Sequence, residues 1–385
     1  QQLARINEVV ILIDEYDKPI LDNLADLERA QAVREALGAF YGVIKAADEH
    51  VRFVFLTGVT KFSKVSVFSK LNNLLDLTMH PRYGEMLGYT QEELETCFAD
   101  RLVEVGSGLG LDEHELLQQI RHWYDGYRFS AKEARVYNPT STMLMLEHGR
   151  FSNYWFETGT PRLLLDMIEI SDFDIRDAEG VKLPDLAFST YEVDQLKPEP
   201  LLFQTGYLTI TDYDPDRMLY TLGYPNFEVK NSFLYYLVDR FSSVRKERAA
   251  TYLERLLAAL DVDDLPLFFE ALRAFFANIP YDIQIRSEKY YQSVFYLVFT
   301  LLGYWAEAEV RTNRGRADVV VQTDTEVYVF EFKLFDTKES ALAQIKERTY
   351  FEKFLGTGKT IHLVGVELDK DERNIGGWVE EVVGG

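Results

Sequence analysis

The stretch from Gly315 to Lys333 constrains the fold of this chain more than any other. It reads GRADVVVQTDTEVYVFEFK, and two short runs rich in Val, Tyr and Phe flank the polar turn Gln322 to Glu326. Such runs around a short polar turn predict a β-hairpin. The second run ends with Glu331 and Lys333, and residues two apart on a strand face the same side of a sheet. We therefore expect these two charges to project together, with the neighbouring phenylalanines on the opposite face.

The hairpin also gathers charge at one end of its sheet. Asp318 stands near the start of the first strand, so it can lie opposite the end of the second, beside Glu331 and Lys333. Two carboxylates can hold a hard cation such as Mg²⁺, and the cation and a lysine can activate water and stabilise charge on phosphorus. The alternative is a solvated surface without chemistry. Apolar neighbours favour strands buried on both faces, where three unpaired charges are costly: Val319, Val320, Val321, Val327, Val329, Phe330 and Phe332.

The same stretch resembles the active site of the PD-(D/E)xK nuclease superfamily. Asp318, Glu331 and Lys333 match its motif residue by residue, although Ala317 stands where the motif name has a proline. The resemblance implies a restriction-endonuclease-like α/β domain that cleaves DNA or RNA with Mg²⁺. It also implies that Asp318 and Glu331 bind the metal and that Lys333 orients water or stabilises charge.

Two predicted helices and a strand surround the hairpin in the sequence. Apolar periodicity predicts a helix from Ser287 to Trp305, another from Ser340 to Leu355, and a strand from Ile361 to Glu367. In PD-(D/E)xK folds a glutamate on the first helix often faces the metal site, and Glu288 fits that place. The alternative is a solvated acid near a helix N-terminus. The resemblance likewise suggests that Gln344 points to the site, whereas an isolated glutamine would be a surface residue.

The beginning of the chain predicts a second candidate site. Glu8 to Glu15 reads EVVILIDE, a buried strand that ends in Asp14 and Glu15, which is the form of a Walker B strand. There the Asp would hold Mg²⁺ and the Glu would polarise the attacking water. The alternative is a plain buried strand before an acidic loop. A helix from Leu27 to His50 and a strand from Val51 to Thr57 complete a predicted βαβ unit.

Further runs resemble the bacterial AAA-ATPase-like family whose members carry a C-terminal PD-(D/E)xK nuclease domain. Thr60 and Lys61 follow the second strand, where AAA-type ATPases keep a γ-phosphate sensor, and the resemblance implies that they contact the nucleotide. The runs that carry the resemblance cover most of residues 8–210: LTGVTKFSKVSVFSKLNNLLDLT, GYTQEELE, WYDGYRFS, VYNPTS and YWFETGTPRLLL.

The sequence contains no complete P-loop, GxxxxGK[ST]. The similar run Gly356 to Thr360 has Lys353 at the position of the first glycine, and it precedes an apolar run instead of following one, so it predicts a turn. We expect that the chain is a fragment without its natural N-terminus. We also expect these 385 residues to hydrolyse ATP weakly or not at all, because the phosphate-cradling amides are missing.

The middle of the chain predicts a winged-helix-like module. Two β-runs, from Leu201 to Ile210 and from Met218 to Val229, flank a charged turn from Asp212 to Arg217. Winged helices can bind DNA. The turn holds three aspartates and one arginine, which suits phosphates poorly, so we expect a structural or interdomain role.

Composition limits the functional classes. The formal net charge is −22, and residues 1–280 carry 28 basic and 45 acidic residues, whereas residues 281–360 carry 11 and 12. The acidity therefore lies mainly in the part before the hairpin domain, and nothing in the overall charge attracts nucleic acid. Cys97 is the only cysteine, which excludes an internal disulfide and fits the cytoplasm. The longest apolar segment, 290–305, is short for a membrane span and indicates a core helix.

The sequence thus predicts an α/β protein in three parts: a partial P-loop AAA-type ATPase domain (1–185), a winged-helix-like and helical connector (186–280) and a nuclease-like domain (281–385). Its expected function is Mg²⁺-dependent nucleic-acid cleavage, joined to a module that binds ATP and Mg²⁺ in the full-length protein. Two alternatives remain. One is an ATP-dependent switch or interaction protein that binds nucleic acid or protein without cleaving. The other is an inactive partner whose acidic surface mimics DNA. A homo-oligomer is left open.

Overall fold

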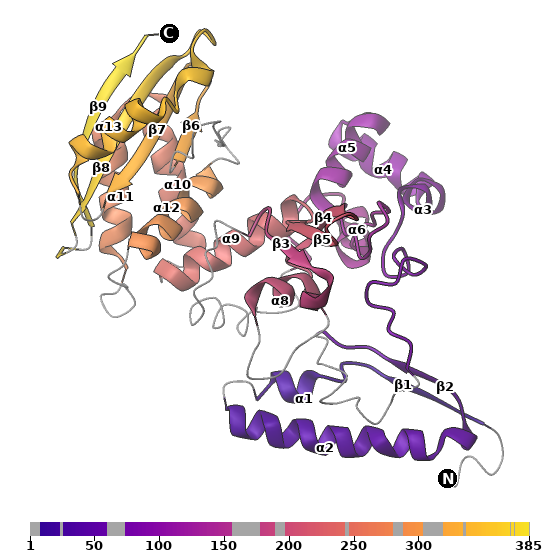
Figure 1. Cartoon of the computed structure of the whole chain (residues 1–385). Coiled ribbons are helices and arrows are strands. Elements are labelled where there is room, and N and C mark those ends of the chain that lie inside the picture. Colours follow the sequence, from indigo (N-terminus) through magenta and orange to yellow (C-terminus); the bar gives the residue numbers. More distant parts are fainter. Residues whose placement is uncertain are drawn as a thin grey trace. The chain divides into compact units, whose positions relative to one another are not determined.

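The computed structural model describes residues 8–23, 26–59, 74–155, 178–188, 197–242, 246–279, 288–302, 319–333, 336–369, 371–372 and 374–384. The chain is a mixed α/β protein that divides into two compact units, Gln1–Lys230 and Asn231–Gly385. Both units contain helices and strands (Figure 1). The three-part division predicted from the sequence stays a prediction.

The first unit begins with two parallel strands connected through helices. The elements are β1 (Val9–Ile13), α1 (Lys18–Leu21), α2 (Leu27–Ala46), the 3₁₀ helix η2 (Asp48–His50) and β2 (Val51–Leu56). The side chain of Asp26 caps α2 by accepting a hydrogen bond from the backbone N–H of Arg29 at 3.1 Å. Tyr16, Ile20 and Tyr41 are buried together where the loop after β1 meets α2. The predicted strand, helix and strand are confirmed, although α2 ends four residues before His50.

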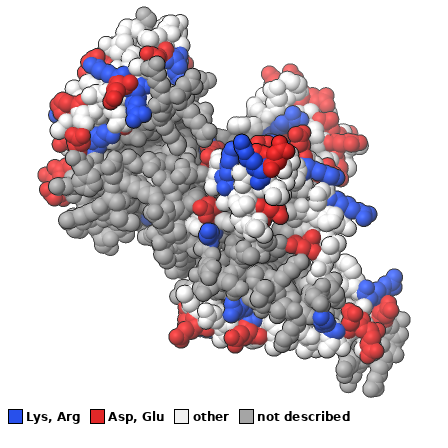
Figure 2. Space-filling model, in the orientation of Figure 1, with Lys and Arg blue, Asp and Glu red and all other residues white. Residues whose placement is uncertain are grey.

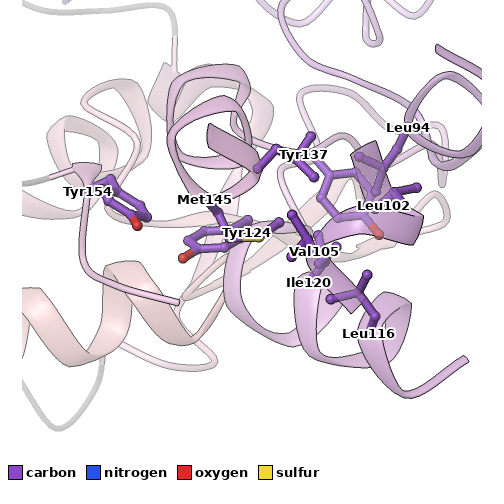
Figure 3. Close-up of a cluster of buried hydrophobic side chains, with 10 residues drawn as sticks. Leu94, Leu102, Val105, Leu116, Ile120, Tyr124, Tyr137, Met145 and Tyr154 are labelled. Atoms are coloured by element: carbon purple, nitrogen blue, oxygen red, sulfur yellow. The ribbon is translucent and has the colours of Figure 1, made fainter. Parts of the chain in front are cut away.

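Four helices follow and pack around a common core. They are α3 (Gln91–Cys97), α4 (Ala99–Leu109), α5 (Glu113–Tyr124) and α6 (Pro139–His148). Helices α3 and α5 begin with capping boxes, Thr90 with Glu93 and Asp112 with Glu115, which satisfy backbone N–H groups of the first turn. Figure 3 shows the core, whose buried side chains come from all four helices and the loops beside them: Leu94, Leu102, Val105, Leu116, Ile120, Tyr124, Tyr137, Met145, Leu146 and Tyr154.

A small antiparallel sheet in the order β3-β5-β4 stands near the end of the first unit. Its strands are β3 (Lys182–Pro184), β4 (Thr209–Asp214) and β5 (Leu219–Gly223). The 3₁₀ helix η5 (Asp185–Phe188) and helix α8 (Pro198–Gln204) lie between β3 and β4 in the sequence. The predicted β-run from Leu201 was wrong in its first part, because residues 201–204 belong to α8. Pro198 opens this helix, where a missing N–H costs nothing. Gly206, with φ of 81°, then turns the chain toward β4.

The second unit is built on a four-stranded mixed sheet in the order β6-β7-β8-β9. The strands are β6 (Val319–Gln322), β7 (Glu326–Lys333), β8 (Thr360–Asp369) and β9 (Asn374–Val383). β6 is antiparallel to β7, β7 is parallel to β8, and β8 is antiparallel to β9. The predicted hairpin and the predicted strand after it are confirmed, whereas β9 was not predicted.

Within the described residues, five α-helices belong wholly or partly to the second unit. They are α9 (Phe227–Ser242), α10 (Lys246–Asp261), α11 (Leu265–Ala277), α12 (Glu288–Leu302) and α13 (Lys338–Arg348). The division between the two units falls within α9. The short 3₁₀ helix η6 (Glu352–Phe354) follows α13. Helix α13 ends earlier than predicted, because Thr349 adopts a left-handed φ of 52°. No helix in the described part of the chain is long and apolar enough to cross a membrane.

Different helices cover the two faces of the sheet (Figure 1). On one face the ring centroid of Phe330 in β7 lies 5.3 Å from that of Phe299 in α12. On the other face Val329 shares a buried cluster with Ile345 of α13. Because side chains alternate along a strand, every second residue of β7 therefore faces α13.

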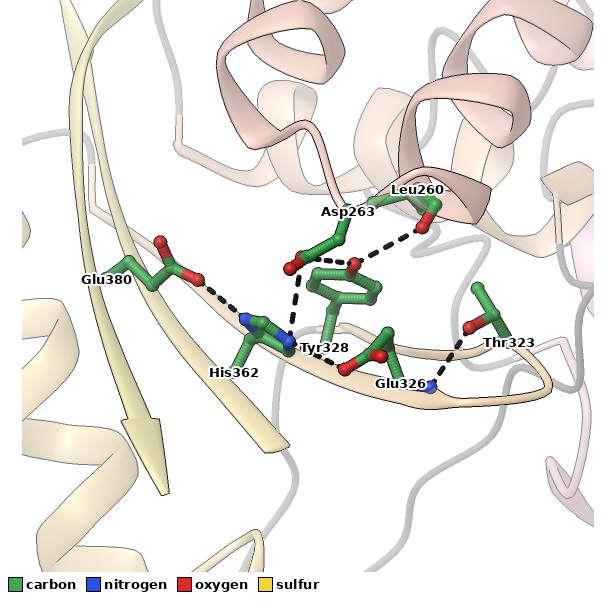
Figure 4. A network of polar contacts seen from close by, with 7 residues as sticks. All are labelled: Leu260, Asp263, Thr323, Glu326, Tyr328, His362 and Glu380. Atoms are coloured by element: carbon green, nitrogen blue, oxygen red, sulfur yellow. Dashed lines mark hydrogen bonds and ion pairs between the residues drawn. The ribbon is translucent and has the colours of Figure 1, made fainter. Parts of the chain in front are cut away.

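A polar network around the buried His362 connects the turn after α10 to the sheet (Figure 4). This His362 network consists of Asp263, Glu326, Tyr328, His362 and Glu380. The side chain of His362 is 3% exposed, and it bonds Glu380 through Nδ1 at 2.6 Å and Glu326 through Nε2 at 3.0 Å. The Tyr328 hydroxyl donates to Asp263 at 2.8 Å, and its ring stacks on His362 with centroids 4.6 Å apart. Because both ring nitrogens meet carboxylates, the geometry fits a doubly protonated imidazolium.

The carboxylates reverse the effect of burial on this histidine. Burial alone would lower the pKa of His362, but the hydrogen bonds to Glu380 and Glu326 and the charge of Asp263 raise it above its ordinary 6.5. The pKa of Glu326 is lowered in turn. Burial alone would raise it, but the hydrogen bond to His362 lowers it. The network is therefore a charged link between β7, β8, β9 and the turn after α10.

Candidate active site

Strand β7 ends in a buried carboxylate and its partner lysine. Glu331 is only 2% exposed although its side chain is ionisable. The Nζ of Lys333 lies 3.3 Å from the Oε1 of Glu331, and 20% of the lysine side chain is exposed. Burying a carboxylate is costly unless it is paired, and the spacing of two along a strand supplies that partner locally.

Helix α13 brings an amide to the same carboxylate. The hydroxyl of Thr337 caps the helix by accepting a hydrogen bond from the N–H of Ser340 at 3.2 Å. Ile345 on the inner face of α13 is buried against the sheet. The adjacent Gln344 donates from Nε2 to Oε1 of Glu331. The structure therefore brings together Glu331, Lys333 and Gln344, which we name the Glu331 site.

Two more acids beside Lys333 were missed in the sequence. Asp336 accepts the N–H of Thr337 at 2.8 Å and the hydroxyl of Ser340 at 2.6 Å. The bond from Ser340, then the bond from Thr337 and the charge of Lys333, lower the pKa of Asp336. Glu367 in β8 is the parallel neighbour of Lys333. Glu367 could have been found only from the strand pairing. Asp336 stands just before the start of α13, and an acid in that place is usually interpreted as a helix cap.

Two predicted members of the site are not placed by the structure. Asp318 lies outside the described residues, directly before Val319, whose partner in β7 is Phe330. Glu288 is the first residue of α12, and its side chain lies outside the described part of the chain. Among the residues that the structure describes, no group of three or more His, Cys, Asp or Glu is arranged to hold a metal ion.

The acids after β1 form the second candidate site. The Oδ1 of Asp14 accepts hydrogen bonds from the backbone N–H of Glu15 at 3.0 Å and from the hydroxyl of Thr57. Thr57 follows β2, so the parallel pairing brings the two strand ends together, which is where α/β proteins bind ligands. Glu15 adopts a left-handed φ of 50°. The other residues predicted for this site lie outside the described residues: Thr60 and Lys61.

Asp17 is a buried carboxylate near this second site that was missed in the sequence. It is 0% exposed, and its Oδ1 accepts the backbone N–H of Val59 at 3.1 Å. A Cβ at Gly58 would lie 2.6 Å from the same oxygen, so the loop after β2 packs closely here. The only signal in the sequence is an acid before Lys18 and Pro19, which by itself indicates a helix cap.

The P-loop-like run is a turn, as predicted. Gly356 and Gly358 both have φ of 80°, and Thr360 begins β8. A phosphate-binding loop would follow a strand and open a helix. This run instead leads into a strand, which confirms that it is no P-loop.

Comparisons with known proteins agree with both resemblances. The model of the PD-(D/E)XK nuclease superfamily matches residues 286–378, and the model described as "Predicted AAA-ATPase" matches residues 2–68. The chain is 41% identical over 389 residues to the "Uncharacterized protein in vnfD 5'region" of Azotobacter chroococcum mcd 1, an alignment that covers 98% of this chain and 72% of that protein. No solved structure matches the chain. The chain therefore belongs to the same family as the Azotobacter protein, as a member with an AAA-ATPase-like N-terminal region and a C-terminal PD-(D/E)XK nuclease superfamily domain.

Proposed function

We propose that the second unit is a Mg²⁺-dependent nuclease that hydrolyses phosphodiester bonds of DNA or RNA. One observation carries the proposal: a buried Glu331 meets Lys333 and Gln344 at one end of a sheet, inside the region that matches the nuclease superfamily. Carboxylate, ammonium and amide side chains together suit a cation and a phosphate better than a purely structural core.

The donor atoms at the Glu331 site are of the kind that a hard cation prefers. Glu331 offers carboxylate oxygen, and the nearby Asp336 and Glu367 add negative charge around Lys333. Glu331 and Asp318 would hold Mg²⁺, which when bound supplies a polarised phosphoryl oxygen and a more acidic water.

The protein groups have separate tasks in this proposal. Lys333 carries a fixed positive charge, held 3.3 Å from Glu331, and would orient the attacking water or stabilise the charge that develops on the phosphate. Gln344 holds Glu331 in one orientation by donating to Oε1. Glu288 would assist from the start of α12.

The test is cleavage of labelled DNA and RNA with Mg²⁺ and with a chelator. Lys333→Ala and Asp318→Ala should each abolish metal-dependent cleavage and leave the circular dichroism spectrum unchanged. Lys346→Ala is the matched control, because Lys346 forms an exposed ion pair with Glu381 in the same unit. Unchanged cleavage in the first two variants would refute the assignment.

We infer that the first unit is a nucleotide-binding module for ATP and Mg²⁺. Asp14, ordered by Thr57, would bind the ion and Glu15 would polarise water, and Thr60 and Lys61 would contact phosphate. Because these 385 residues contain no P-loop, we expect weak or no ATP hydrolysis from them. Robust Mg²⁺-dependent turnover of ATP by this chain would contradict that expectation.

A second candidate function is binding without cleavage, coupled to an ATP-dependent switch. The low basicity of the chain, whose net charge is −22, motivates this candidate in place of a nuclease, and Figure 2 shows acidic and basic side chains mixed over the described surface of this face. Salt-sensitive binding of nucleic acid without metal and without cleavage would support this candidate against the nuclease.

We propose a structural role for the winged-helix-like segment around α8, β4 and β5. Arg217, the basic residue of the turn, lies 3.5 Å from Asp214, so its charge is directed to an acid. Arg217→Glu should therefore leave nucleic-acid affinity unchanged in a filter-binding assay, and a clear loss of affinity would refute the structural role.

A further inference from the structure

Helix α13 lies directly on the backbone of β8 at Gly365. A Cβ at this residue would lie 2.2 Å from the carbonyl oxygen of Lys338 and 2.7 Å from the amide nitrogen of Leu342. Both atoms belong to the backbone of α13, so neither can rotate away as the end of a side chain could. The helix can lie this close to the strand only because residue 365 has no side chain.

The same glycine is the parallel neighbour of Glu331. The register of β7 and β8 pairs Glu331 with Gly365. Leu342, whose backbone touches the glycine, stands two residues before Gln344, whose Nε2 donates to Glu331. The close contact between helix and strand therefore lies beside the bond from Gln344 to Glu331.

We propose that Gly365 is a positioning residue that holds Gln344 against Glu331 by allowing α13 to lie on β8. Any side chain at residue 365 pushes the first turns of α13 outward and breaks or lengthens the bond from Gln344. The effect on cleavage rests on the proposed nuclease function. The effect on the contact between Gln344 and Glu331 does not.

The neighbouring strand offers a matched control. A Cβ at Gly377 of β9 would lie 3.2 Å from Nζ and 3.5 Å from Cδ of Lys338, which are atoms of a flexible side chain. Gly377→Ala thus adds the same methyl group against the same helix, but it meets atoms that can move aside.

The first measurement reads the contact directly and needs no activity. The side-chain amide resonance of Gln344 is identified in a ¹H–¹⁵N spectrum by its loss in Gln344→Ala. We expect Gly365→Ala to shift this resonance toward the positions of exposed glutamines, because the bond to a carboxylate is lost. Gly377→Ala should leave the resonance in place. An unchanged Gln344 resonance in folded Gly365→Ala overturns the proposal.

The second measurement is metal-dependent cleavage by Gly365→Ala, Gln344→Ala and the double variant. Groups that orient a metal ligand commonly contribute about 10- to 100-fold in activity, and we expect each single variant to lose that much. The double variant should be no slower than Gln344→Ala, because both changes remove one interaction. Losses that multiply would show that Gly365 acts only through general stability, and would overturn the proposal. If the wild-type protein cleaves nothing, the proposed function fails alone and the resonance of Gln344 still decides the role of Gly365.

Discussion

Two charged clusters on the sheet of the second unit hold their charges in different ways. The His362 network includes Glu326 at the start of β7, whereas the Glu331 site lies at the end of that strand. The buried groups are alike in exposure, since the side chains of His362 and Glu331 are each 3% exposed. Their surroundings differ. The His362 partners come from β7, β9 and the turn after α10, whereas Lys333, which forms an ion pair with Glu331, stands two residues away on the same strand.

This difference separates a cluster that holds the fold together from one that is suited to chemistry. Removing His362 would leave acids from three elements facing one another, so the cost should appear as stability. Lys333 keeps 20% of its side chain exposed and stands two residues from Glu331 on the same strand, so changes in this pair should appear as activity.

The largest expected effect is on cleavage by Glu331→Gln. The amide is close in shape and its oxygen can still accept a bond from Gln344, but it lacks the charge that would hold a cation. We expect a loss of about 10³-fold in cleavage rate, with an unfolding free energy within about 1 kcal/mol of wild type. Initial rates and urea unfolding measure the two quantities. A large loss of stability with activity retained would reverse the comparison.

His362→Ala should show the opposite pattern. Breaking the network should lower the free energy of unfolding by about 3 kcal/mol, the low end for a buried ion pair, because Asp263 is half exposed. Cleavage per folded molecule should not change, since the network lies on the other face of the sheet from Glu331. Urea unfolding followed by fluorescence provides the measurement. Near-wild-type stability would show that the network is replaceable.

Titration of His362 should have a smaller effect than its removal, because a neutral imidazole keeps one N–H donor. The pKa of His362 in the folded protein is raised above 6.5. Its stabilisation is therefore fully present below pH 6.5 and is lost as the pH rises through the folded pKa. The difference in unfolding free energy between wild type and His362→Gln should shrink over that window. A difference independent of pH would exclude a charged His362.

The smallest effect belongs to an exposed ion pair. Lys346 and Glu381 pair across α13 and β9 with side chains 44% and 46% exposed. Lys346→Ala should change the free energy of unfolding by about 1 kcal/mol or less and should not affect cleavage. Thermal unfolding at low and high salt measures this change in the free energy of unfolding. A larger change would mean that exposed charges of α13 also contribute to the site.

The sequence predicts those features that arise from local patterns. The β6–β7 hairpin follows from runs of Val, Tyr and Phe around a polar turn, and the common face of Glu331 and Lys333 follows from their spacing. The β1–β2 pair follows from two apolar runs around a helix. For Gln344, spacing carries no information, and only the resemblance to a nuclease family pointed to it.

Features that depend on distant residues could not be predicted in this way. Strand β9 contains Gly376 and Gly377, and glycines weaken a strand, so its local sequence gives little signal. It is held by pairing with β8 and by the stacking of Trp378 on Phe269, whose ring centroids lie 5.0 Å apart. The His362 network joins positions 263, 326, 328, 362 and 380, which no spacing rule connects. The catalytic roles of Glu331, Lys333, Gln344, Asp318 and Glu288 all stay predictions, and the structure does not describe the side chains of the last two.

Strand β9 also bears on how copies of this protein behave at high concentration. It lies at the edge of the described sheet and pairs there with β8. An edge strand offers backbone groups to other chains, which is a common start of aggregation. Here the register shift after Glu367 and the adjacent glycines interrupt the regular edge. These features make β9 a poor template for pairing with a second copy, so its length adds little tendency to aggregate.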